Sequence, residues 1–131
     1  MGNRNQRGVS LSVFACGAIL ALLIMAGLVV DGTAQLLAHQ RAEDAAAQVA
    51  RFAVDAAVPY MVDGRDGQAA ALTAAGQAAK RYDNIVFAYS VDATGALHVS
   101  TATSVPTVFL RLIGIQTLQA TGEATAVVFQ P

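Results

Sequence analysis

Residues 9–30 read VSLSVFACGAILALLIMAGLVV, a run of 22 positions that contains no charged side chain. A helix needs roughly 20 apolar residues to cross the hydrocarbon core of a bilayer, so this run is long enough to span it with some tilt. Twelve of its residues are Leu, Ile, Val or Phe, and each of these favours insertion by roughly 0.3–0.6 kcal/mol at the helix centre. The run therefore predicts one transmembrane helix over residues 9–30, with a buried core helix as the alternative.

The charges on either side of this run predict the direction in which it crosses. Arg4, Arg7 and the N-terminal amine precede it, and Asp31 follows it directly. Because positively charged flanks stay in the cytoplasm, we expect residues 1–8 to be a cytoplasmic leader and residues 31–131 to be an extracytoplasmic domain. The prediction is a single-pass protein of the cytoplasmic (inner) membrane. We interpret Asp31 as a marker of the bilayer boundary, with little desolvation.

A cleaved signal peptide is a second interpretation of the same run. The apolar part of such a peptide spans only ~7–15 residues, but Gly32, Thr33 and Ala34 are small residues in a cleavage-like arrangement. The single cysteine, Cys16, cannot form an intrachain disulfide. It also lies near the start of the run, whereas a lipid-modified cysteine follows such a run. We expect Cys16 to be a small apolar residue that faces lipid or a neighbouring helix.

Composition limits the classes of function that the rest of the chain can have. The 131 residues leave room for one domain besides the apolar helix. Residues 31–131 carry six basic and nine acidic side chains, a net charge of −3, which argues against nucleic acid or anionic lipid as the main partner. The sequence contains no metal-ligand spacing and no glycine-rich phosphate loop, so we expect no cofactor and no metal.

A helical pattern continues beyond the apolar run. Small, mostly alanine side chains repeat at spacings of three and four and form one stripe: Ala34, Ala38, Ala42, Ala45, Val49, Phe52 and Ala56. We expect the helix to continue through residues 31–58 and to end at Pro59 and the DGRDG sequence of residues 63–67. Alanine buries little area, so this stripe needs a partner, either later segments of the chain or another subunit.

The remainder of the chain predicts a second helix and a sheet. Residues 68–82 form an Ala-rich helix that Gly76 weakens, and residues 85–130 form three strands, with a turn at residues 92–95. Thr107 is the expected cap of a short helix over residues 107–113, which Gly114 ends. The predicted fold class is α+β, a three-stranded antiparallel sheet with one face packed on helix. One side of the first strand is predicted to carry Ile85, Phe87, Tyr89 and Val91, and one side of the last strand Leu118, Ala120, Gly122, Ala124, Ala126 and Val128, with Leu97, Val99 and Thr101 in the returning strand between them.

The order of these features resembles a known family. Arg7-Gly8 ends a short basic leader, Val30-Asp31-Gly32 follows the apolar helix, and the Ala-rich helix contains QRAEDAA at residues 40–46. Later, VPT at residues 105–107 and LRLIGI at residues 110–115 run into a strand of alternating Ala and Thr. Together, over nearly the whole chain, these features resemble the TadE/TadG-like proteins of tight-adherence (Flp) pili, particularly actinobacterial-looking members.

The resemblance implies a pilin-like or pseudopilin-like protein that helps to assemble or cap an adhesive or secretory filament. The partners that it implies are the lipid bilayer, other pilus-assembly or pilin-like proteins, and further copies of the chain as a homo-oligomer. It also implies a candidate leader cleavage site between Gly8 and Val9. Many family members have a Glu early in the apolar helix, where this chain has Ser12 and Val13. A membrane-tethered binding or scaffold domain unrelated to pili is the alternative function.

Two pairs of residues are candidates for specific contacts. Gly17 and Ala21 form a small-xxx-small pair, which allows two helices to approach closely within a membrane. Phe109 and Ile113 belong to the most apolar segment of the outer domain. They are expected either to fill the core beneath the sheet or to contact a partner or the bilayer surface.

An extracytoplasmic enzyme is a further alternative, which would need a cluster of convergent polar groups. Ser90, Asp92 and His98 could lie together in the predicted hairpin as a hydrolase-like trio. Alternating polar residues on an exposed sheet face produce such clusters readily, however, and the sequence has no nucleophile-elbow motif. The other histidine, His39, lies on the predicted helix with no further Cys or His near it. We therefore predict that the protein is not an enzyme.

Overall fold

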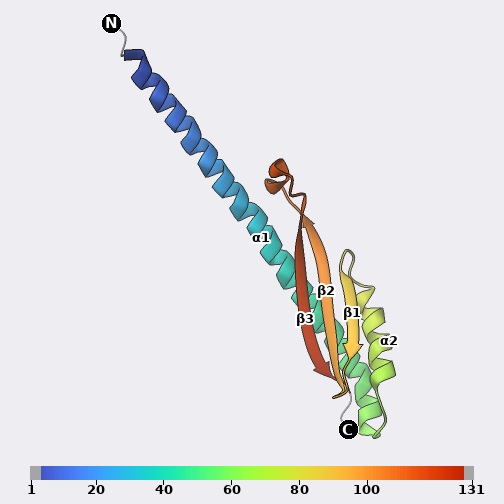
Figure 1. Cartoon of the computed structure of the whole chain (residues 1–131). Coiled ribbons are helices and arrows are strands. Elements are labelled where there is room, and N and C mark those ends of the chain that lie inside the picture. The colour runs from blue at the N-terminus through green and yellow to red at the C-terminus, as the bar shows by residue number, and fades with distance from the viewer. Residues whose placement is uncertain (1–3, 129–131) are drawn as a thin grey trace.

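The computed structural model describes the backbone of residues 4–128 and the side chains from residue 8 onward. Residues 1–3 of the predicted leader and residues 129–130 of the predicted sheet lie outside the described residues. The predicted α+β fold is confirmed (Figure 1). In chain order the elements are α1 (Arg4–Val62), α2 (Gln68–Ala79), β1 (Val86–Val91), β2 (Ala96–Pro106), the 3-10 helix η1 (Leu110–Ile113) and β3 (Thr117–Val127).

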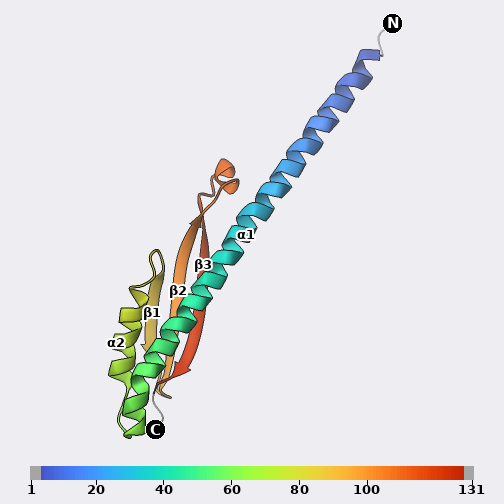
Figure 2. The ribbon, with the colours of Figure 1, turned by 180° about the vertical axis from the view of Figure 1, so that it is seen from behind.

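Helix α1 is one continuous element of 59 residues, roughly 88 Å long at 1.5 Å per residue. It does not break at Asp31-Gly32, so the predicted continuation of the apolar helix is confirmed. Figures 1 and 2 show that its first half projects away from the other elements, whereas its second half runs along the sheet. We call residues 8–30 the exposed half and residues 31–62 the packed half.

The end of α1 differs from the prediction. Pro59 lies inside the helix, which continues for three more residues, and Met61 in this last turn packs against the core. Gly64, with a φ of 70°, ends the helix instead. Its N–H donates to the carbonyl of Met61 (3.1 Å), and the N–H of Arg65 donates to the carbonyl of Tyr60 (2.7 Å). This is the Schellman pattern, in which a left-handed glycine satisfies the last carbonyls of a helix.

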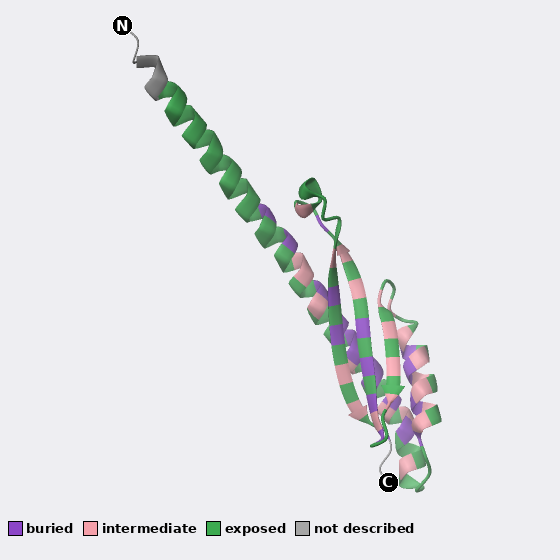
Figure 3. Cartoon of the chain, in the orientation of Figure 1, coloured by how far each residue is buried: buried purple, intermediate pink, exposed green. Residues whose placement is uncertain are grey.

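The sheet has the predicted antiparallel order β1-β2-β3. In its centre Tyr89 pairs with Val99, which pairs in turn with Ala124. The packed half of α1 covers one face of the sheet, and α2 lies beside the end of α1 (Figure 2). Buried and exposed residues alternate along β2 and β3 (Figure 3), and the buried set includes Leu97 and Val99. The predicted alternation is therefore confirmed along these strands, and the side with Leu97, Val99, Ala120 and Gly122 is the one that packs on α1.

The core between α1 and the sheet consists largely of alanine. Ala38, Ala42, Ala45 and Val49 are buried as predicted, but Phe52 is 43% exposed. Beyond Val49 the buried stripe continues instead through Ala50, Ala53 and Ala57. The reason is that α2 also packs against this part of α1, so a neighbouring face of the helix becomes the contact surface.

Three further boundaries differ by a few residues from those predicted. Helix α2 ends at Ala79 rather than residue 82, and β1 begins at Val86 rather than residue 85. The short helix begins at Leu110 rather than residue 107, because the Thr107 hydroxyl instead donates to the carbonyls of Ile115 and Gln116. Its predicted end at Gly114 is confirmed, with a φ of 93°.

Candidate functional site

The exposed half of α1 carries a nearly unbroken series of exposed large apolar side chains, from Val9 to Val30. Of residues 8–30, Gly27 alone is buried. Leu22 is 65% exposed and Phe14 is 74% exposed. Gly17 and Ala21 are also exposed, and no side chain of the described residues lies within 4 Å of the position that a Cβ on Gly17 would occupy. Helix α1 is long and apolar enough to cross a membrane, and 6% of its most apolar window is buried inside the molecule.

A loop of the outer domain contacts α1 where the exposed half ends. The β2–β3 loop, residues 107–116, includes η1 and projects from the sheet along α1 toward its N-terminal end (Figure 1). The Asp31 carboxylate accepts three backbone N–H groups from this loop. The donors are Val108 (2.8 Å), Phe109 (3.0 Å) and Leu110 (2.7 Å). These bonds hold the loop against the helix.

Asp31 therefore has a role that its interpretation as a boundary marker missed. It is 2% exposed, although it directly follows the 22 uncharged positions of the apolar run. The N–H of Val108, followed by those of Leu110 and Phe109 and by the charge of Arg111, lowers the pKa of Asp31, although desolvation opposes this shift. A carboxylate with several N–H donors is favoured in its ionised form. Asp31 thus links the end of the apolar run to the loop.

Gly27 provides a second contact between α1 and the loop. A Cβ built on Gly27 would lie 2.7 Å from both Cβ and Cγ of Phe109, a distance that real Cβ atoms do not tolerate. Only glycine allows Phe109 to lie this close to the helix backbone. Because Gly27 precedes Asp31 by one helical turn, the two residues form a single contact surface for the loop.

The outer surface of the loop is apolar and exposed. Leu112 is 81% exposed, Ile113 is 73% exposed and Val108 is 59% exposed. The expectation that Phe109 and Ile113 fill the core beneath the sheet is therefore wrong. Phe109 lies against α1 with 40% of its surface exposed, and Ile113 is too exposed to belong to the core. Contact with a partner or the bilayer stays as a prediction for both residues.

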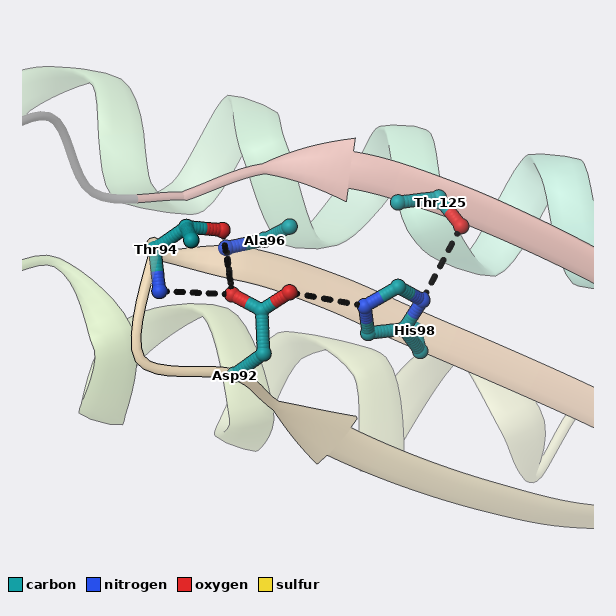
Figure 4. Close-up of polar contacts among 5 residues, drawn as sticks. All are labelled: Asp92, Thr94, Ala96, His98 and Thr125. Carbon is teal, nitrogen blue, oxygen red and sulfur yellow. Dashed lines mark hydrogen bonds and ion pairs between the residues drawn. The ribbon is translucent and has the colours of Figure 1, made fainter.

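The structure brings two of the three hydrolase-like candidates together. Nε2 of His98 lies 3.1 Å from Oδ2 of Asp92, and Nδ1 of His98 lies 3.1 Å from Oγ1 of Thr125 (Figure 4). Ser90 is opposite His98 in the sheet register, yet Thr125 is the hydroxyl that contacts the imidazole. Ser90, His98 and Thr125 are exposed and alternate with buried or half-buried residues along their strands, so they lie on the face of the sheet away from α1, and Asp92 lies in the exposed turn that follows β1.

Asp92 also organises the turn between β1 and β2. Its Oδ1 accepts the Thr94 N–H (2.8 Å), the Thr94 hydroxyl (2.6 Å) and the Ala96 N–H (3.0 Å), as Figure 4 shows. The Thr94 hydroxyl, then His98 and the Ala96 N–H, lower the pKa of Asp92. These bonds give Asp92 a structural role in the turn that was predicted over residues 92–95.

His39 has a structural contact that its sequence context did not indicate. Its Nδ1 lies 3.1 Å from the backbone N of Thr121 and 2.8 Å from the carbonyl oxygen of the same residue. One turn earlier, Gln35 donates to the carbonyl of Gln119 (2.9 Å). Polar side chains of α1 thus bond to backbone groups on the outer edge of β3, beside which the described part of the chain places no further strand. A helical pattern alone cannot indicate such pairings, because it contains no information about a strand 82 residues away.

Metal ligands and known relatives provide no further guide to function. Across the described residues 4–128, no group of three or more His, Cys, Asp or Glu side chains is arranged to hold a metal ion. No protein-family model matches the chain, and no curated protein or solved structure is significantly similar to it. The fold and the contacts at the end of the exposed half therefore carry the functional argument.

Proposed function

We propose that this chain is a single-pass protein of the cytoplasmic membrane that acts as a pilin-like component in the assembly of a tight-adherence pilus or secretion filament. The observation that carries the proposal is the division of one unbroken helix into an exposed apolar half and a half packed under a small sheet. The exposed half would lie in lipid, and the domain at its end would be displayed outside the membrane. This is the arrangement that the resemblance to TadE/TadG-like proteins implies.

Charge supports the orientation with the N-terminus inside. Arg4 and Arg7 precede the exposed half, and the net charge of residues 31–131 is −3. The positive-inside rule counts Lys and Arg close to the ends of the membrane helix, and the first such residue after the exposed half is Arg41, so the rule favours retention of the leader in the cytoplasm and export of the domain. Little of the exposed half of α1 is covered by the rest of the chain. This is expected of a helix that is surrounded by lipid and not by a protein core.

The mode of action that we propose is packing between proteins rather than catalysis. An exposed Gly17 and Ala21 would let a second membrane helix approach α1 closely, either from another copy of the chain or from a pilin-like partner. Replacement of Gly17 with Leu should then reduce crosslinking between membrane helices, whereas the matched change Ala18→Leu, about 100° around the helix, should reduce it less. Equal crosslinking of the two variants would contradict this use of the Gly17 face.

Deletion and complementation test the proposed role. Cells without the chain should lose surface filaments or the secretion that depends on them, and the wild-type chain should restore the phenotype. Full filament assembly in the deletion strain would leave a membrane-tethered scaffold unrelated to pili as the better explanation. A reporter fused after residue 131 tests the orientation, because an enzyme that is active only outside the cytoplasm should be active there. The mass of the mature chain tests cleavage between Gly8 and Val9.

A further inference from the structure

We propose that the tip of the β2–β3 loop, formed by Val108, Leu112 and Ile113 around Arg111, inserts into the headgroup region of the outer leaflet. The outer domain would then contact the bilayer at a second point beside its own anchor, rather than being connected to it by the helix alone. This inference rests on the proposed insertion of the exposed half of α1. The partner that we propose for the loop tip is lipid and not another protein.

The position of the loop along α1 sets its depth. Phe109 contacts the helix at Gly27, which precedes Val30, the last residue of the apolar run, by three positions. At 1.5 Å per residue, this contact lies roughly 4–5 Å inside the apolar run. Interfacial elements bury their apolar face roughly 5–10 Å into the headgroup and acyl boundary. If the exposed half spans the bilayer, the loop is at this depth without any rearrangement.

The composition of the tip fits a lipid interface. Arg111 is the only ionisable residue among residues 107–116, and its apolar neighbours Leu112 and Ile113 are among the most exposed large side chains of the domain. The Arg111 Nε donates to the carbonyl of Thr107 (3.0 Å), which leaves the other guanidinium N–H groups to reach lipid phosphate. An arginine among exposed aliphatic side chains is typical of segments that lie in the membrane interface.

Contacts within the loop keep the tip in this position. Asp31 accepts the three N–H groups at the start of the loop, and Thr107 bridges to Ile115 and Gln116 at its end. The exposed aliphatic side chains therefore cannot turn inward to join the core without the loss of these bonds. Because these side chains are held exposed at the level of the bilayer boundary, the apolar surroundings that they can reach are those of the lipid interface.

Depth-dependent quenching of a single tryptophan tests the inference. The chain has no Trp, so Leu112→Trp gives the full-length protein one fluorophore at the loop tip. Two matched variants accompany it: Leu22→Trp in the exposed half of α1, and Val62→Trp, which is 80% exposed and roughly 46 Å beyond Asp31 along α1. Each variant is reconstituted into phosphatidylcholine vesicles that carry bromine either high or low on the acyl chain.

We expect bromine high on the acyl chain to quench roughly half or more of the Leu112→Trp emission, and bromine low on the chain to quench much less of it. Leu22→Trp should be quenched most by deep bromine, and Val62→Trp by neither. Quenching of Leu22→Trp without quenching of Leu112→Trp would overturn the inference while leaving the membrane anchor intact. Blue-shifted emission of Leu112→Trp without bromine quenching would mean that protein covers the tip, and would also overturn it. Absence of quenching for Leu22→Trp would contradict the proposed anchor itself. Ile113→Trp repeats the test at a second exposed position.

Discussion

The two halves of α1 differ in the side chains they carry and in how far these side chains are buried. In the exposed half, large aliphatic side chains such as Leu22 and Leu23 keep 65% and 58% of their surface exposed. In the packed half, Ala42, Ala46 and Ala53 have no exposed surface. In a soluble domain the large apolar residues are the buried ones. The contrast indicates that the two halves are adapted to different surroundings.

The difference follows from what each half must contact. Large side chains present much apolar area, which favours insertion into lipid. Alanine presents little area but allows backbones to approach closely. Where β3 crosses α1, a Cβ on Gly122 would lie 2.3 Å from the backbone N of Glu43 and 2.4 Å from the carbonyl carbon of Ala42. The hydroxyl of Thr101 donates to the Ala42 carbonyl (2.8 Å) at the same crossing.

The largest expected effect comes from a charge in the exposed half. We expect Leu22→Arg to abolish membrane retention, because exchanging Leu for Arg at the centre of a membrane helix costs about 3–4 kcal/mol, more than a hundredfold in partitioning. Fractionation of cells that express the variant measures this. Val62→Arg, at an exposed position of the packed half, is the matched control and should stay in the membrane fraction. Recovery of Leu22→Arg in membranes at the wild-type level would contradict the proposed anchor.

The second prediction concerns the close crossing in the packed half. Gly122→Ala should destabilise the domain by about 2–3 kcal/mol, because its methyl group meets the backbone of α1 and not a side chain that can move. Gly76→Ala is the control, since nothing lies within 4 Å of the added Cβ. Its expected effect is a stabilisation of roughly 0.5–1 kcal/mol, from the better helix propensity of Ala. Chemical unfolding of the full chain in detergent, followed by circular dichroism, compares the two variants.

The third prediction tests the junction between the two halves. Asp31→Asn should loosen the β2–β3 loop, because the amide replaces one acceptor oxygen by a donor and removes the charge that the three N–H groups contact. Hydrogen exchange at Val108 and Leu110 should accelerate on the order of tenfold or more. Asp63→Asn, an exposed position outside this contact, should leave these rates unchanged. Unchanged exchange in Asp31→Asn would show that Phe109 and Gly27 suffice to hold the loop.

The smallest expected effect is a loss of stability in acid. The pKa values of Asp31 and Asp92 are lowered in the folded chain, whereas an unfolded Asp titrates near 3.9. The folded state then binds fewer protons than the unfolded state, so this contribution is complete above about pH 5 and is lost as pH falls below about 4. Melting temperatures at neutral pH and near pH 3 measure the loss. The loss should be smaller in Asp92→Asn, and an equal loss in that variant would contradict the role of the turn contacts.

The local elements of this protein were largely predictable from its sequence. The apolar run, the change of period from helix to strand and the turn at residues 92–95 are patterns within short windows, and each is present in the structure. The end of α1 was predicted too early, because the rule that proline stops a helix outweighed Gly64, the residue that ends it. Phe52 was placed in the buried stripe because periodicity does not show that α2 changes the contact face.

The contacts that define the candidate site could not be predicted in the same way. Asp31 and Val108 are 77 positions apart, and no local pattern links a carboxylate after an apolar run to the N–H groups of a distant loop. The same is true of Gly27 with Phe109, and of Gly122 with the backbone of Ala42.

The order of the amino acids is thus enough to predict one helix with an apolar half and an alanine half, followed by three alternating strands. Hydrophobicity and side-chain period are properties of neighbouring residues, so the chain alone contains them. The position of the β2–β3 loop against α1 at Gly27 and Asp31, with Leu112 and Ile113 exposed, becomes visible only in the folded chain. That arrangement depends on which distant backbone groups meet, and such meetings are fixed by the packing of the whole chain.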